Sequence, residues 1–483
     1  MKKLVFSLLL TAMAVANAVA QPAFSRGYEN RSFTVDQFEQ GCYLGAYNLL
    51  DVWVIEGKKN LKQLALLDRH LDPNGAAVLP ESAKLEVLAA GMHDNDAAVL
   101  LVDRSVKNRT VVLRTHIDLL TMAVDPYDTV VRLDYERKDK CNVWAASSPN
   151  GANLGVVAIV EYTEQKQYRT FIAMCNNHGA QLWEKEFALG TMSDVFVTDD
   201  GRIVSLGYEE SEQVTNFVVN VISDEQASSY SAAVKCDPIK ELRLVNVVGS
   251  YAVAAGTYQP SDVRNADKLT AGVVGLSFNI ESAAVAGITM RPFQNEELNM
   301  FLNEKTKKVQ KIQAIDRITV QGYAPLSYGA AIAVGRTVRI EITKNGHTSI
   351  VRQENGVSVA AVDTTGHFRW VRNFRRFDTQ KNENVPMTIG MVESDGKLCV
   401  VRSESNSLPP IYDIAKPAKE FVIGGKSNMA VYTINPDGDT EKLIVERKTK
   451  HTLLRPLLRQ DGTIVLLTAN GKYTRAAEMM FQY

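Results

Sequence analysis

The sequence predicts an all-β fold, a β-propeller built of four-stranded antiparallel blades. Short runs rich in Val, Ile, Leu and Tyr recur through most of the chain, Gly, Asn and Asp turns separate them, and long helical periodicity is almost absent. Four-stranded units that recur about every 45–70 residues are typical of propeller blades. A pair of β-sandwiches is the alternative, but sandwich strands would not keep a single turn order.

One stretch shows the repeated unit most clearly. Four strand-like runs follow one another between residues 141 and 187, with tight turns at Pro149-Asn150-Gly151 and Asn177-His178-Gly179. Asn-Gly pairs suit tight hairpins because both residues tolerate positive φ. The same order of strands and turns fits four further stretches, at 192–235, 240–290, 312–378 and 385–452.

The two ends of the repeat region predict how the ring closes. Residues 84–140 fit the unit less cleanly, and the final run, 453–471, supplies only a first and a second strand. An incomplete last blade can be completed by strands from the other terminus, which removes the free sheet edges that invite aggregation. We expect the runs at 50–56 and 61–67 to do this. This count predicts seven blades, with six or eight as alternatives.

Two distant segments share a pattern that predicts how blades pack. In Cys175–Phe187 and in Val362–Phe374, tryptophan follows a turn glycine by four residues and phenylalanine follows by eight. Ala361-Val-Asp-Thr-Thr-Gly-His-Phe-Arg-Trp370 resembles the tryptophan-docking motif of the PQQ-type (quinoprotein-like) propellers, relatives of the WD40-like propellers. The resemblance implies that Trp183 and Trp370, each after its glycine (Gly179 and Gly366), are wedged between neighbouring sheets. It implies no quinone, and we expect no cofactor.

The first twenty residues predict export. Lys2 and Lys3 precede an apolar run from Leu4 to Val15, and Ala18-Val19-Ala20 offers a small-x-small cleavage pattern. The run is too short for a membrane span, and no cysteine follows it to carry a lipid anchor. We expect residues 1–20 to be a signal peptide and 21–483 a single periplasmic or secreted domain, with a short helix near 291–311 and a Pro-rich loop near 403–420.

Charge and composition narrow the possible partners. Removing the signal peptide deletes two lysines and no acids, which leaves 52 Lys and Arg against 55 Asp and Glu. This balance disfavours nucleic acid and other polyanions. A basic and aromatic stretch around Arg369–Phe377 is interpreted as protection of an outer strand. We expect a monomer without a membrane span whose partner in the cell envelope is a protein or a glycan.

The chain lacks familiar catalytic motifs. It has no phosphate-binding Gly-rich loop, no HExxH and no Gly-x-Ser-x-Gly. None of the seven histidines pairs with another at ligand spacing, so we expect no metal site. His178 and His367 flank turn glycines and are interpreted as exposed turn residues. Cys175 and Cys399 lie in apolar runs and are interpreted as small buried side chains.

Binding is therefore the function we expect, with catalysis as the alternative. The insertions at 258–268, 291–311 and 403–420 all fall on connections that leave the same side of a propeller, and elaborated loops are where binding tends to occur. The opposite side, with tight turns, is expected to be nearly featureless. The binding candidates are tyrosines and acids at the ends of second strands and one loop tyrosine: Tyr162, Tyr208, Tyr258, Glu161, Glu209 and Tyr412.

The candidate tyrosines and acids each have an alternative role. The tyrosines predict an aromatic platform for a sugar or peptide, or ordinary packing between blades. Glu161, Glu209 and Glu210 would instead serve a polysaccharide hydrolase or lyase if two carboxylates converged at the central mouth.

Overall fold

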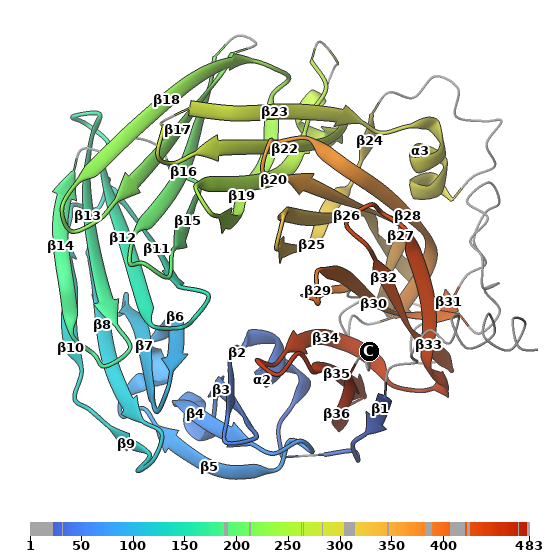
Figure 1. The fold of residues 1–483 in the computed structure, drawn as a ribbon, viewed down its shortest axis with the longest axis horizontal. Helices are drawn as coiled ribbons and strands as arrows, with labels where there is room; N and C mark the ends of the chain where they lie inside the picture. Colours follow the sequence, from blue (N-terminus) through green and yellow to red (C-terminus); the bar gives the residue numbers. More distant parts are fainter. Residues whose placement is uncertain are drawn as a thin grey trace, which may run out of the picture.

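A computed structural model shows a ring of antiparallel sheets around a central axis (Figure 1). It describes residues 23–30, 32–187, 192–211, 214–261, 263, 265–282, 284–303, 314–344, 347–381, 389–405, 421–422, 426–471 and 473–480. The fold is an all-β propeller, as the sequence predicts. The described residues form eight blades, so the expected number of seven is wrong and the alternative of eight is the one found.

The first four blades follow in chain order, with the first strand of each nearest the axis (Figure 1). Blade 1 comprises β2 (Cys42–Tyr47), β3 (Leu50–Glu56), β4 (Lys62–Leu67) and β5 (Pro73–Val78). Blade 2 comprises β6 (Glu86–His93), β7 (Asp96–Asp103), β8 (Arg109–Asp118) and β10 (Asp128–Asp134), with β9 (Ala123–Val124) paired to β8. Blade 3 comprises β11 (Lys140–Ser147), β12 (Asn153–Tyr162), β13 (Gln167–Asn176) and β14 (Gln181–Phe187). Blade 4 comprises β15 (Asp194–Val197), β16 (Ile203–Ser211), β17 (Val214–Ile222) and β18 (Ala227–Lys235).

The remaining blades carry the additions to the basic unit. Blade 5 comprises β19 (Ile239–Val248), β20 (Tyr251–Tyr258), β22 (Gly272–Asn279) and β23 (Ala284–Pro292). Blade 6 comprises β25 (Ile318–Leu326), β26 (Gly329–Lys344), β27 (His347–Asp363) and β28 (Phe368–Lys381), and β31 (Phe421–Val422) runs parallel to β28. Blade 7 comprises β29 (Gly390–Ser394), β30 (Lys397–Ser405), β32 (Ser427–Ile434) and β33 (Thr440–Thr449). Blade 8 comprises β34 (Thr452–Leu458), β35 (Ile464–Asn470), β36 (Tyr473–Met480) and β1 (Ala23–Arg26).

The N-terminus closes the ring, but not through the strands that the sequence suggested. The runs at 50–56 and 61–67 are β3 and β4 of a complete blade 1. The closing strand is β1, which pairs antiparallel with β36 from Ala23↔Met480 to Arg26↔Ala477. The last blade thus supplies three of its own strands. The third, β36, escaped the prediction because Tyr473–Met480 carries Ala, Arg and Glu where strands usually carry β-branched residues.

The core is divided among the seams between blades. Eight hydrophobic clusters lie between consecutive blades, one at each seam. Because side chains alternate along a strand, Val156 of β12 packs towards blade 2 while Val157 packs towards blade 4. Each blade is therefore buried on both faces, which explains why the second and third strands are so uniformly apolar.

Both motif tryptophans lie at such seams. Trp183 is 9% exposed and belongs to the cluster between blades 3 and 4, and Trp370 is 5% exposed and belongs to the cluster between blades 6 and 7. The motif glycines have φ values of +80° and +78°. At Gly366 a Cβ atom would lie 2.3 Å from the carbonyl oxygen of Gly287 in blade 5, so the turn is pressed against its neighbour.

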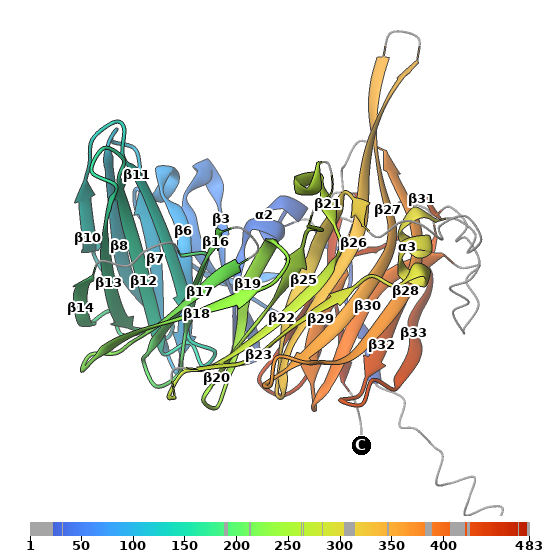
Figure 2. The same ribbon diagram turned by 90° about the horizontal axis from the view of Figure 1, so that it is seen from above.

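The two sides of the ring differ. The insertion face carries the connections from second to third strands and from one blade to the next, and the turn face carries the tight hairpins. Figure 2 shows the β26–β27 hairpin rising beyond the ring on the insertion face. Other elements added to the basic unit are η3 (Ala266–Lys268), the pair β21 (Leu269–Thr270) and β24 (Ile315–Asp316), α3 (Asn295–Leu302) and β31.

The predicted insertions can be compared with these elements. η3 lies in the 258–268 segment, and α3 lies in the 291–311 stretch where the sequence suggested a helix. Residues 406–420 of the third insertion are outside the described residues, and so are residues 1–20, where a signal peptide was expected. The long β26–β27 hairpin was not expected, because residues 312–378 were predicted to form an ordinary four-stranded unit.

Candidate functional site

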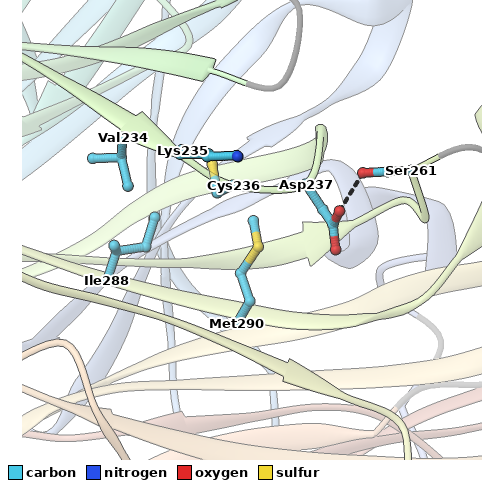
Figure 3. Close-up of a pocket in the computed structure, with 7 residues that line it drawn as sticks. All are labelled: Val234, Lys235, Cys236, Asp237, Ser261, Ile288 and Met290. Atoms are coloured by element: carbon cyan, nitrogen blue, oxygen red, sulfur yellow. Dashed lines mark hydrogen bonds between the residues drawn. The ribbon is translucent and has the colours of Figure 1, made fainter.

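A hollow on the insertion face lies where blades 4 and 5 meet. Its volume is about 580 Å³. Figure 3 shows its lining, which comes from the end of β18, the linker to blade 5, the loop after β20 and the outer strand β23: Val234, Lys235, Cys236, Asp237, Ser261, Ile288 and Met290. A volume of this size falls within the range of ligand pockets.

The floor of this hollow is apolar. Val234, Ile288 and Met290 are half-buried and pack against the cluster between blades 4 and 5. They belong to β18 and β23, the fourth strands of their blades, where alternate side chains face the seam. Because each is only half-buried, part of each side chain remains available to an apolar group of a ligand.

The rim of the hollow is polar. Asp237 accepts a hydrogen bond from the Ser261 hydroxyl, which ties the linker of blade 4 to the loop of blade 5 (Figure 3). Lys235 is exposed beside them. The Cys236 thiol donates to the Thr215 hydroxyl oxygen at 3.3 Å, and burial raises the pKa of this thiol. A thiol with a raised pKa stays protonated at neutral pH, so Cys236 is suited to packing rather than to nucleophilic chemistry.

A second hollow occupies the equivalent place between blades 2 and 3. It measures about 350 Å³ and lies between the linker after β10 and the turn after β12. Tyr135 and Tyr162 line it together with several charged residues. The Lys138 ammonium lies 3.1 Å from Glu136 and is also paired with Glu164, so much of the charge around this hollow is already balanced.

The three predicted tyrosines lie at seams and not on one open platform. Tyr162 is half-buried and lines the hollow between blades 2 and 3, and Tyr208 is half-buried against the cluster between blades 4 and 5. Tyr258 is 3% exposed, and burial raises its pKa to about 12. Packing between blades thus accounts for Tyr258, which has almost no surface to offer a ligand. Tyr412 is outside the described residues.

The predicted acids lie on second strands and not on the first strands, which are nearest the axis. They are close to the ends of the second strands of blades 3 and 4. A carboxylate oxygen of Glu161 lies 3.5 Å from the Lys140 ammonium. Glu210 accepts from the backbone N–H of Ile239 at 2.5 Å. Glu209 is exposed. Glu161 and Glu210 therefore hold neighbouring segments in place.

Two of the four arginines in the basic stretch of β28 are buried, one is half-buried, and Arg369 is exposed. Arg376 is 4% exposed and pairs with Glu354 at 2.6 Å, and Arg375 is 3% exposed. Arg372 donates to the carbonyl oxygen of Gly438 in blade 7 at 2.6 Å. The first contact lies within blade 6, the second joins blade 6 to blade 7, and both arginines are thus engaged inside the protein.

The turn face has a hollow that the sequence did not suggest. It measures about 570 Å³ and is formed by the ends of first strands from four consecutive blades, 5 to 8. Val247, Leu326, Met391 and Leu458 contribute to its lining. The expectation of a nearly featureless face was wrong here, because it considered turn lengths and ignored the ends of the first strands, which line this hollow.

No local motif marks the hollow between blades 4 and 5. Its walls come from two blades, and the Asp237–Ser261 bond joins residues 24 positions apart. Among all the residues that the structure describes, no three His, Cys, Asp or Glu side chains are grouped so that they could hold a metal ion. None of the described helices is both long and apolar enough to cross a membrane.

Solved structures that resemble this chain include propellers. The WD40 domain of SCAP from fission yeast matches at 10% identity and a TM-score of 0.34, covering 96% of this chain and 97% of that one. The propeller domain of the Trilobed protease from Pyrococcus furiosus matches at 10% identity and a TM-score of 0.35, covering 83% of this chain and 96% of that one. The Dos1 propeller matches at 8% identity and a TM-score of 0.34, covering 82% of this chain and 92% of that one. No protein-family model and no curated protein matches the chain. These structural neighbours are WD40 and other β-propellers.

Proposed function

We propose that this chain is an exported β-propeller that binds a partner in the cell envelope through its insertion face and does not catalyse a reaction. The observation that carries the proposal is the hollow between blades 4 and 5, which combines an apolar floor with a polar rim on that face. Binding sites on rigid scaffolds commonly combine these two features.

The lining favours a protein over a glycan. Ile288 and Met290 offer aliphatic contact, which suits an apolar side chain of a polypeptide. Lys235 and the Asp237–Ser261 pair stand beside this floor and supply groups that would orient a peptide backbone or a charged side chain. A sugar site would instead call for an exposed aromatic face, and Tyr258 is buried.

The test is recovery of partners from the envelope fraction by the mature chain, followed by mass spectrometry. Met290→Asp places a charge on the apolar floor, and Lys235→Glu reverses the charge at the rim, so both should reduce recovery of the same partner. Leu120→Asp is the matched control, because Leu120 is 68% exposed and follows β8 on the turn face. Variants that recover the partner as well as the parent, or a loss caused by Leu120→Asp alone, would contradict the proposal.

Export is part of the proposal and has its own test. The basic start, apolar run and Ala18-Val19-Ala20 pattern support cleavage after residue 20. N-terminal sequencing of the protein from the periplasmic or extracellular fraction should begin at Gln21. A chain that keeps Met1 and stays with the cytoplasm would refute export without touching the binding proposal.

A further inference from the structure

The β26–β27 hairpin continues well beyond the sheet to which it belongs (Figure 2). β25 pairs with β26 only as far as Ile318↔Arg336, whereas β26 and β27 stay paired to Lys344↔His347. Within the part of the chain that the structure describes, no further strand lies along the outer edge of β26 beyond Thr337. Such an edge is a template for strand pairing.

The backbone direction along this edge follows from one hydrogen bond. The N–H of Thr337 points away from β27 and donates to the carbonyl oxygen of Arg317 at 3.0 Å. Because the direction alternates along an antiparallel strand, the backbone groups of Arg339 and Glu341 lie on the same outer edge, and those of Ile340 point to β27.

The side chains along the edge form a self-complementary pattern. Arg339 and Glu341 are exposed, carry opposite charges and stand two residues apart on one side of the hairpin, while Ile340 between them is half-buried on the other side. If a second copy runs antiparallel with Ile340 opposite Ile340, Arg339 of each copy faces Glu341 of the other. Arg339 and Glu341 are also the residues whose backbone groups point outward. The same register therefore forms both the backbone hydrogen bonds between the two copies and the two charge pairs.

We propose that two copies of this chain associate by antiparallel pairing of their β26 edges around Ile340. Charges on an edge strand usually prevent pairing, but here an antiparallel copy meets each charge with its opposite. Arg339 already takes part in an interaction within the single chain, so pairing exchanges that interaction for a new one. A strand pair of this length buries less than the roughly 1,200 Å² of a stable interface, so the dimer is weak and concentration-dependent.

The test is sedimentation velocity of the mature chain over a series of concentrations. Arg339→Glu and Glu341→Arg each place like charges opposite one another twice per dimer, so each should weaken association roughly tenfold. The double variant R339E/E341R restores opposite charges and should recover the parent's dimerisation. Lys107→Glu, an exposed charge reversal between β7 and β8, should change nothing.

Restoration by the double variant is the decisive arm, because a nonspecific loss of association would not be reversed by a second charge change. Thermal unfolding of each variant should match the parent, since both positions are exposed. A parent that is monomeric at every concentration, or single variants that associate like the parent, would overturn the proposal. So would a double variant that behaves like the singles.

Discussion

The imidazole Nδ1 of His178 lies 2.9 Å from the Oδ2 atom of Asp96, and this contact joins blade 3 to blade 2 on the turn face. The other oxygen of Asp96 lies 2.6 Å from His116 Nε2, whose Nδ1 lies 2.9 Å from Asp125. An imidazole with a carboxylate at each nitrogen is satisfied when both nitrogens carry protons. The seam thus holds a linked set of two histidines and two acids.

Protonation of His116 should stabilise the fold. Burial disfavours its charged form, but the hydrogen bonds to Asp96 and Asp125 outweigh burial and raise the pKa above its ordinary value. The resulting stabilisation is complete below the pKa that His116 has in the unfolded chain, about 6.5. It is lost as the pH rises through the higher pKa that His116 has in the folded protein. His116→Gln should therefore flatten the fall in melting temperature between about pH 6 and pH 8. His367→Gln, an exposed turn substitution, is the control, and an unchanged slope in His116→Gln would refute the linkage.

Loss of either motif tryptophan should destabilise the ring. Trp183 and Trp370 fill seams, so replacing either with alanine should lower the free energy of unfolding by roughly 3–5 kcal/mol. Chemical denaturation measures the change. Leu182→Ala is a matched control, because Leu182 precedes Trp183 but is 49% exposed. Tryptophan variants as stable as the parent would show that the shared motif has no packing role.

The seam where the ring closes depends on a buried ion pair. Arg459 of blade 8 holds both oxygens of Asp51 in blade 1, at 2.8 and 2.7 Å, and Asp51 is 1% exposed. Asp51→Ala would remove a buried acid that holds two guanidinium nitrogens of the largely buried Arg459 side chain, so we expect a loss of about 3 kcal/mol in unfolding free energy. Glu186→Ala removes the exposed pair with Arg169 and should cost less than about 1 kcal/mol. Similar losses in the two variants would contradict this account.

The short closing strand can be tested with one substitution. Gly27 donates its N–H to Ala476 at 3.0 Å, so the N–H of Ser25, two residues earlier, also faces β36. Ser25→Pro removes this donor and should lower the melting temperature and promote aggregation through the uncovered edge of β36. Ser25→Ala keeps the N–H and should behave like the parent, because Ser25 is exposed. A proline variant that melts with the parent would mean that β1 does not hold the ring closed.

Much of the architecture could be predicted from the sequence, because strands and turns depend on residues that are close together in the chain. Alternating apolar side chains and tight glycine turns such as Gly151, with φ +74°, specify strands and hairpins whatever their neighbours are. The recurrence of one strand order then predicts blades. The number of blades was harder to read, since β1 has only four residues and β36 has a composition unusual for a strand.

The contacts between blades were decided by the tertiary structure. Asp96 and His178 are far apart in the chain, and so are Asp51 and Arg459, so no spacing rule could pair them. The hollow between blades 4 and 5 arises in the same way, from strands of two blades that meet only when the blades pack together. Strands and turns could be predicted from the sequence because hydrogen bonding and side-chain alternation act over a few residues. The packing of whole blades against one another determined the seams, because it brings together side chains that are far apart in the sequence.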